Sequence, residues 1–257
     1  MKNLVYFTVG CDPNYASLLK VCIASLRASS DMSNTDILVI CDQSYVQHIK
    51  ELHTHVHVVN QEVRSGVEAS MQKVRVFEWP HIMDYAKVVY LDCDIVICKD
   101  IACIFDGITD VGTLYTCPEK DFKNPHESLF FSLQEYTADE LSTLNARGVY
   151  GFNCGQFGFC VDAIMKGHFE DVCKSMNEGL AAGKRFFYEQ SFMNVHFNNL
   201  GRRDDELFYK VTNLTPWNMD VHDGIVIAHF ANASISWPSK LRSMLALGNK
   251  LGFGFSV

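Results

Sequence analysis

The stretch that most constrains this chain runs from Lys87 to Asp94 and reads Lys-Val-Val-Tyr-Leu-Asp-Cys-Asp. Its apolar, β-branched part, Val88 to Leu91, is typical of a strand buried on both faces of a sheet. Parallel strands of this kind point their carboxyl ends at the crevice where α/β proteins bind ligands. Two carboxylates, Asp92 and Asp94, stand at that end. The stretch therefore predicts an α/β fold with a ligand site at the end of a central strand.

These two carboxylates suggest a divalent cation. Buried carboxylates repel each other and lose hydration unless a cation lies between them. Oxygen ligands suit Mg²⁺ or Mn²⁺, which proteins usually bind through one or two carboxylates together with substrate phosphates. The alternative is a strand that merely ends in a polar turn. The strand alone favours neither interpretation, because Asp-x-Asp is common by chance.

Composition narrows the class of protein. A chain of 257 residues, 48% of them hydrophobic, is long enough for one large α/β domain, and a net charge of −8 disfavours a nucleic-acid-binding surface. No apolar run reaches the ~18 residues of a transmembrane segment. Met1 leads directly into a strand-like segment rather than a signal peptide. None of the ten cysteines forms a Cys-x-x-Cys pair, so reduced core thiols and a cytoplasmic location are expected.

Strand-like and helical patterns alternate along the chain. Strands are expected over 3–8, 36–41, 88–91, 95–98, 111–116, 151–161, 206–211 and 225–229, and helices over 12–26, 44–52, 66–79, 101–105, 162–183, 186–200 and 238–247. The alternation predicts a mostly parallel central sheet with helices on both faces. The first helix is expected to bury Tyr15, Leu18, Leu19, Cys22 and Leu26.

Two further segments are interpreted more cautiously. The polar, mixed segment 118–146 is expected to be an insertion or a mobile loop beside the site. His53, His55 and His57 alternate as strand residues on one face do. A solvated strand face is favoured over a metal cluster there, because no carboxylate or cysteine accompanies them.

Five short motifs stand in one order along the chain: Thr8-Val-Gly-Cys-Asp-Pro-Asn-Tyr15, Asp92-Cys-Asp94, Phe152-Asn-Cys-Gly155, Glu189-Gln190 and His229-Phe230. In this order the chain resembles glycosyltransferase family eight, the glycogenin-like and bacterial galactosyltransferase-like enzymes with a GT-A fold. The resemblance extends from Val5 to Trp237. Each motif alone is weak, since an Asn beside glycine usually marks a turn and a lone His usually lies in the core. Their shared order carries the resemblance.

The resemblance implies an overall activity. It implies a single GT-A nucleotide-diphospho-sugar transferase domain over 1–257, with a nucleotide-binding half, 1–116, and an acceptor-side half with a C-terminal closing segment, 117–257. The expected activity is that of a metal-dependent, retaining hexosyltransferase. The expected donor is a UDP-sugar, and the acceptor a carbohydrate or another hydroxyl compound. A homodimer is the family-level expectation.

The resemblance also assigns residues. Asp92, Asp94 and His229 would bind Mn²⁺ or Mg²⁺, and Tyr15 would stack on the base. The catalytic candidates are Glu189, Gln190, Asn153 and Lys73. The residues expected to bind the nucleotide sugar are Thr8, Val9, Gly10, Asp12, Tyr15, Lys73, Asp92, Cys93, Asp94, Asn153, Gly155, Gln190, His229, Asn232 and Lys240.

Two departures from the family pattern matter. Glu189 stands where the family usually has Asp. Of the family's His-x-x-Gly-x-x-Lys-Pro-Trp motif only His229 and Trp237 remain, and Ile235 takes the place of the Lys that faces the diphosphate. Lys240, at the start of the terminal helix, is the nearest candidate replacement, and Arg242 is a weaker one. The alternative is that Lys240 is a solvated surface residue, as most lysines are.

Two other functions compete with transfer. A haloacid-dehalogenase-type phosphatase is suggested by Val-Val-Tyr-Leu-Asp-Cys-Asp-Ile-Val, which resembles its nucleophile strand. That motif normally opens the domain, and this chain has no Gly-Asp dipeptide for the later acidic motif. A catalytically weak nucleotide-sugar-binding protein is the second alternative, and the missing Lys keeps it open.

Overall fold

The computed structural model describes residues 1–58, 63, 65–120, 123, 125–128, 136–183, 188–214, 221–231 and 234–255. Within them, a seven-stranded sheet has the order β3-β2-β1-β4-β7-β6-β8, and a three-stranded sheet has the order β5-β10-β9. The large sheet is built from β1 (Lys2–Val9), β2 (Thr35–Cys41), β3 (His55–Val58), β4 (Tyr85–Leu91), β6 (Leu114–Pro118), β7 (Phe152–Cys160) and β8 (Arg203–Asp204). The small sheet is built from β5 (Ile95–Ile97), β9 (Thr212–Leu214) and β10 (Ile227–His229).

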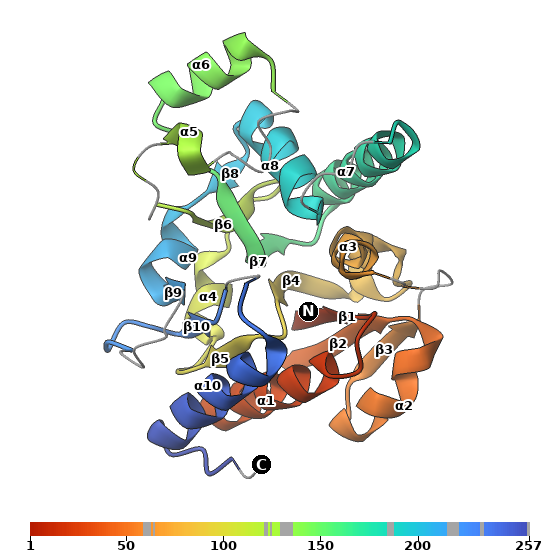
Figure 1. Ribbon diagram of the computed structural model, residues 1–257, viewed down its shortest axis with the longest axis vertical. Coiled ribbons are helices and arrows are strands. Elements are labelled where there is room, and N and C mark those ends of the chain that lie inside the picture. The colour runs from red at the N-terminus through yellow and green to blue at the C-terminus, as the bar shows by residue number, and fades with distance from the viewer. Residues whose placement is uncertain are drawn as a thin grey trace.

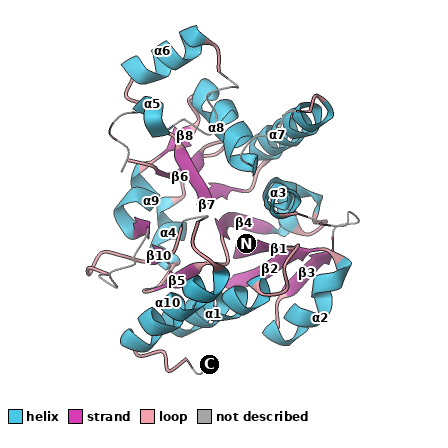
Figure 2. Cartoon of the chain, in the orientation of Figure 1, coloured by secondary structure: helices cyan, strands magenta, loops and turns pink. Residues whose placement is uncertain are grey.

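Helices lie to either side of the strands (Figure 2). The α-helices are α1 (Tyr15–Ser29), α2 (Val46–Ile49), α3 (Gly66–Met71), α4 (Ala102–Gly107), α5 (Pro125–Ser128), α6 (Ala138–Ala146), α7 (Ala163–Ala181), α8 (Tyr188–Leu200), α9 (Glu206–Val211) and α10 (Trp237–Lys250). The 3₁₀ segments are η1 (Gln43–Tyr45), η2 (Lys50–Leu52), η3 (Gln72–Glu78) and η4 (Ile82–Asp84).

The large sheet is mostly parallel, as predicted. Strands β3, β2, β1 and β4 pair in parallel, and β8 pairs in parallel with β6. Strand β7 runs antiparallel to both β4 and β6. The predicted central strand, β4, therefore lies where the parallel half of the sheet meets the antiparallel half, and its carboxyl end faces both.

Two hydrophobic cores cover the two faces of this sheet. Along β1, Val5 and Phe7 enter one core, while Leu4 and Tyr6 enter the other. Helices α1, α4 and α10 close the first core, and α7, α8 and η3 close the second (Figure 1). Because both faces are buried, β1 and β4 have continuous apolar runs rather than alternating ones. The prediction of helices on both faces is confirmed.

Two of three local predictions were wrong. Residues 206–211 form helix α9 rather than a strand, with Phe208 fully buried and a Lys210–Glu206 ion pair of 2.8 Å one turn apart. Segment 66–79 is helical as predicted, with α3 continued by the 3₁₀ helix η3. Tyr15 is not part of the buried face of α1: it is 41% exposed, because it is the first residue of the helix and faces outward.

Other expectations met mixed outcomes. Segment 118–146 contains α5 and α6, and α6 begins with a Thr137–Glu140 capping box. Much of the rest of this segment lies outside the described residues. All ten cysteines are free of disulfides, although Cys11 and Cys103 are exposed rather than in the core. No metal-donor group includes His53, His55 or His57 within the described ranges. None of the helices described here is long and apolar enough to cross a membrane.

Candidate functional site

Three metal donors meet at the carboxyl end of β4. Asp92 and Asp94 follow this strand directly, and the chain then continues into β5. Strand β10 pairs antiparallel with β5 in a register that sets His229 opposite Ile95. His229 Nε2 consequently lies 3.2 Å from Asp94 Oδ1 and 3.9 Å from Asp92 Oδ2. One donor atom from each of the three residues lies within 4.8 Å of the others, and no other such group occurs among the described residues.

The donor set fits a divalent cation. Two carboxylates and one imidazole offer hard oxygen ligands and a borderline nitrogen, which together suit Mn²⁺ and also accommodate Mg²⁺. The cluster is shaped against Gly155: a Cβ built there would lie 2.2 Å from His229 Cε1 and 2.8 Å from Asp92 Oδ2. Any side chain at this position would therefore enter the space of the donors.

An irregularity in β7 brings Gly155 to this place. Opposite β6, Thr116 pairs with Phe157 while the next residue, Cys117, pairs with Asn153. The extra residues of β7 bulge out of the ladder, as often happens beside functional sites. Within the bulge, Asn153 Oδ1 accepts from the Gly155 backbone N–H at 2.8 Å, and the Gly155 carbonyl accepts from the Asp92 N–H at 2.6 Å. The Asn-x-Gly motif thus holds the metal donors through the backbone.

The other oxygen of Asp92 belongs to a buried charge network. Asp92 Oδ1 accepts from the Tyr90 hydroxyl at 2.5 Å and pairs with Lys73 Nζ at 3.0 Å. Lys73 Nζ also pairs with Glu189 Oε1 at 2.7 Å and donates to the Cys154 carbonyl at 3.3 Å. Asp92 is thereby held by one oxygen while the other faces His229.

Opposing effects set the pKa values of Lys73 and Glu189. Burial alone would lower the pKa of Lys73, but the charges of Asp92 and Glu189 outweigh it and raise that pKa. Burial raises the pKa of Glu189, although Lys73 and a hydrogen bond from Ser70 act in the opposite direction. The ammonium of Lys73 is therefore a permanent cation of the site.

Helix α8 delivers Glu189 and Gln190 to the same place. Asn194, one turn further along this helix, accepts from the Phe152 N–H at 2.9 Å and donates to the Phe152 carbonyl at 3.0 Å. These two hydrogen bonds to β7 fix the start of α8 beside the bulge, where Gln190 Oε1 accepts from the Cys154 N–H at 3.3 Å.

Lys240 joins the metal donors from α10. Its Nζ lies 2.5 Å from Asp94 Oδ2, and the side chains of both residues are only 11–12% exposed. Burial alone would raise the pKa of Asp94, but His229 and Lys240 outweigh it and hold that pKa well below its usual value. The interpretation of Lys240 as a solvated surface residue is therefore wrong.

The loop after β1 forms the rim of the site. Thr8 Oγ1 lies 3.1 Å from the Tyr90 hydroxyl, which links this loop to Asp92. Gly10 has no room for a side chain, since a Cβ there would lie 2.7 Å from Val63 Cγ1. Asp12 Oδ1 caps the turn by accepting from the Asn14 N–H at 2.9 Å. Tyr15 ends this loop as the first residue of α1, and burial and then the charge of Asp94 raise its pKa.

Not every predicted residue presents a side chain here. Val9 and Cys93 are buried in a hydrophobic core, with the Cys93 thiol directed at the Thr8 carbonyl. Asn232 lies outside the described residues.

Sequence reasoning missed three residues that support the site: Tyr90, Asn194 and Glu119, whose Oε1 accepts from Asn153 Nδ2 at 3.3 Å. Of these only Tyr90 left a signal, as the single polar group in the apolar run before Asp92.

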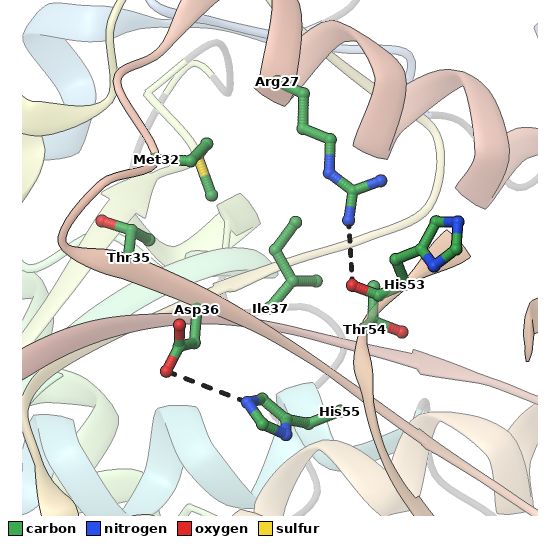
Figure 3. Close-up of a pocket in the computed structure, with 8 residues that line it drawn as sticks. All are labelled: Arg27, Met32, Thr35, Asp36, Ile37, His53, Thr54 and His55. Atoms are coloured by element: carbon green, nitrogen blue, oxygen red, sulfur yellow. Dashed lines mark hydrogen bonds and ion pairs between the residues drawn. The ribbon is translucent and has the colours of Figure 1, made fainter. Parts of the chain in front are cut away.

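A separate pocket lies near the amino ends of β2 and β3, whereas the metal donors lie at the carboxyl end of β4 (Figure 3). It has a volume of about 310 Å³, and none of the predicted site residues lines it. Arg27 points at the His53 carbonyl, and Asp36 pairs with His55 and with Lys2. Its charged groups are thus engaged by backbone carbonyls or by ion pairs, and the donor cluster remains the candidate functional site.

Known proteins resemble this chain over most of its length. Residues 7–216 match the family model described as Glycosyl transferase family 8. Galactinol synthase 5 of Arabidopsis thaliana is 26% identical over 175 residues, which cover 64% of this chain and 49% of that protein. The apo structure of the WbbM bifunctional glycosyltransferase has a TM-score of 0.61 at 15% identity, and the match covers 98% of this chain and 51% of the other. The chain thus spans about half the length of either protein, and the shared fold agrees with GT-A.

The first prediction concerns Gly155. Gly155→Ala should weaken Mn²⁺ binding by about ten-fold or more, equal to ~1.4 kcal/mol, because a Cβ 2.2 Å from His229 Cε1 forces the donors apart. Titration calorimetry measures the affinity. Gly167→Ala on α7, where a Cβ meets nothing within 4 Å, is the matched control. An unchanged Mn²⁺ affinity in Gly155→Ala would show that the donors do not depend on this contact.

The second prediction concerns the buried Lys73–Glu189 pair. Lys73→Met should lower the free energy of unfolding by about 3–5 kcal/mol, because it leaves a buried carboxylate without its partner. Adding Glu189→Gln should restore part of that loss. Urea unfolding measures both variants, and Lys210→Met, which breaks an exposed ion pair, should change little.

The same variant predicts a pH dependence. In Lys73→Met, the pKa of Glu189 stays above its ordinary value of 4.5, so the folded chain holds a proton that the unfolded chain has released. The contribution of Glu189 to the free energy of unfolding should then be greatest below pH 4.5. Above pH 4.5 it should fall by about 1.4 kcal/mol per pH unit, until the pH passes the raised pKa. The control is the double variant that combines Lys73→Met with Glu189→Gln. If the stability of both variants changed with pH in the same way, the assignment of this pH dependence to Glu189 would be wrong.

Proposed function

Because the chain belongs to glycosyl transferase family 8, we propose that it transfers a hexose from a UDP-sugar to a hydroxyl acceptor with retention of anomeric configuration. One observation carries the proposal: Asp92, Asp94 and His229 converge, and Asn153, Glu189 and Gln190 lie beside them. The phosphatase alternative loses support, since the family match accounts for the same strand. The acceptor is proposed to be a carbohydrate or another hydroxyl compound, bound on the side formed by 117–257.

The leaving group is a nucleoside diphosphate, and its charge must be neutralised as the glycosidic bond breaks. A divalent ion held by Asp92, Asp94 and His229 would supply a Lewis acid for this diphosphate. Lys73 pairs with Asp92 and orients it, and the Tyr90 hydroxyl donates to the same carboxylate oxygen. Lys240 adds a cation in contact with Asp94, which offsets the loss of the family's Lys at Ile235. This second cation favours an enzyme over a protein that only binds nucleotide sugars.

The sugar is proposed to lie against the bulge of β7 and the start of α8. The amide groups of Asn153 and Gln190 suit sugar hydroxyls and an oxocarbenium-like transition state. Glu189 is 2% exposed and is paired with Lys73 at 2.7 Å. We assign it the role of a positioning residue that orients Lys73, rather than that of an accessible nucleophile.

Donor specificity is the direct test of the proposed function. In the presence of Mn²⁺, UDP-hexoses should be hydrolysed or transferred faster than GDP-hexoses. The test scans both sets of donors and measures nucleotide release. Binding of UDP-sugars without any release of UDP would support the binding-protein alternative, and release from an aryl phosphate would revive the phosphatase.

The third prediction is that Asp94→Ala weakens metal-dependent UDP binding. Removing one of two carboxylate ligands should lower both Mn²⁺ and UDP affinity by at least about ten-fold, ~1.4 kcal/mol. Calorimetry with and without Mn²⁺ measures this, and Asp110→Ala, an exposed aspartate, is the control. Equal UDP affinity of Asp94→Ala and wild type in Mn²⁺ would exclude the metal assignment.

The fourth prediction concerns the base. Tyr15→Ala should weaken UDP binding by about 1–3 kcal/mol, because its exposed ring offers the stacking surface at the rim. Tyr209→Ala removes an equally exposed tyrosine on α9 and should leave UDP affinity unchanged. Tighter binding of GDP than of UDP by the wild type would refute the assignment of uracil.

A further inference from the structure

One of the metal donors, Asp94, already pairs with a cation of the protein itself. Lys240 Nζ lies 2.5 Å from Asp94 Oδ2, while Asp94 Oδ1 faces His229 Nε2 at 3.2 Å. The contact is largely hidden from solvent, so it is only weakly screened by salt. It joins residues 146 positions apart, through helix α10 packed against α1.

The charges of the site give this contact a consequence. Asp92, Asp94 and Glu189 are balanced in part by Lys73 and Lys240, which leaves one net negative charge. A divalent ion alone would turn this into a net positive charge in a partly buried place. A diphosphate brings at least two negative charges and reverses the balance again. Metal and diphosphate should therefore each favour binding of the other.

We propose that Lys240 makes metal binding conditional on the diphosphate, by competing electrostatically with the divalent ion for Asp94 until the nucleotide binds. The proposal rests on the proposed function, because it takes a nucleoside diphosphate as the ligand. It assigns Lys240 a coupling role in addition to charge neutralisation. This competition accounts for a lysine in direct contact with a metal donor, in a chain that has Ile235 in place of the family's Lys.

A thermodynamic cycle tests the proposal. Calorimetry measures the Mn²⁺ affinity without and with saturating UDP, for wild type and for Lys240→Gln. Glutamine keeps a polar side chain with N–H donors but removes the charge. Lys240→Gln should bind Mn²⁺ alone about ten-fold more tightly than wild type, and UDP should increase its Mn²⁺ affinity about ten-fold less. Lys20→Gln on α1, an exposed lysine, controls for net charge.

The outcomes separate this proposal from the function on which it rests. If Lys240→Gln binds Mn²⁺ alone no more tightly than wild type, or if its coupling to UDP is unchanged, the role of Lys240 is refuted while the function stands. If wild type binds neither Mn²⁺ nor UDP, the proposed function fails first.

A second inference comes from two histidines on the helices α7 and α8. His168 Nδ1 lies 3.2 Å from His196 Nε2, and both side chains are half-buried. Two nitrogens bound to one tetrahedral zinc ion, each ~2.0–2.1 Å from it, lie about 3.3 Å apart. Burial lowers the pKa of His168 and of His196, so both rings are neutral and have a lone pair to offer near pH 7.

The charges around this pair favour a cation. Asp171, exposed on α7, acts on both rings, and Asp162 acts on His168, while Arg202 is the opposing charge. We propose that His168 and His196 bind an imidazole-seeking ion such as Zn²⁺ or Ni²⁺, with water completing its ligands and Asp171 contributing a nearby negative charge. Such an ion would join α7 to α8, the helix that carries Glu189 and Gln190.

Thermal unfolding with Ni²⁺ tests the histidine site, because a ligand that binds only the folded chain raises its melting temperature. Wild type and Asp94→Ala should both gain melting temperature as Ni²⁺ is added, and His168→Gln and His196→Gln should lose this gain. His81→Gln, an exposed histidine, should retain it. No gain in wild type, or an equal gain in His168→Gln, would show that the pair is only a hydrogen bond between helices.

Discussion

The central constraint of this structure is the gathering of three carboxylates at the carboxyl end of β4. Asp92, Asp94 and Glu189 would repel one another in a buried place without cations, and Lys73 and Lys240 supply two of them. The surrounding structure serves this balance. Segment η3 brings Lys73 under the strand, α8 brings Glu189, and α10 brings Lys240. Each element docks by apolar packing and brings one charged side chain to the site.

The topology of the sheet explains why this balance is reached here. Strand β4 is flanked by β1, which runs parallel to it, and by β7, which runs antiparallel. The parallel side supplies the loop from Thr8 to Tyr15, typical of a crevice at strand carboxyl ends. The antiparallel side supplies the bulge with Asn153 and Gly155. The metal donors therefore lie between two structurally different parts of the sheet.

How much could be predicted from the sequence depended on the range of the interactions. The run from Val88 to Leu91 is a local signal, and it predicted the strand and the place of the two aspartates at its end. The donor set that includes His229 was predicted only through the resemblance to the family. Segment 206–211 misled because a short apolar run does not distinguish a strand from a helix, and its placement against β6 is decided by Phe208 in the core. The contacts of Lys240, Asn194 and Glu119 join distant parts of the chain, and no spacing rule reveals them.

The ion pair between Lys240 and Asp94 also bears on the order of folding. It closes a loop of 146 positions, and closing such a loop costs conformational entropy before any contact repays it. Strands β1, β2 and β4 can pair earlier, because hydrophobic side chains drive them together on both faces of the sheet. The charge balance of the site is thus completed only when α10 has docked. A chain that has collapsed around its sheet but has not docked this helix would hold its metal donors together and still lack the cation that faces Asp94.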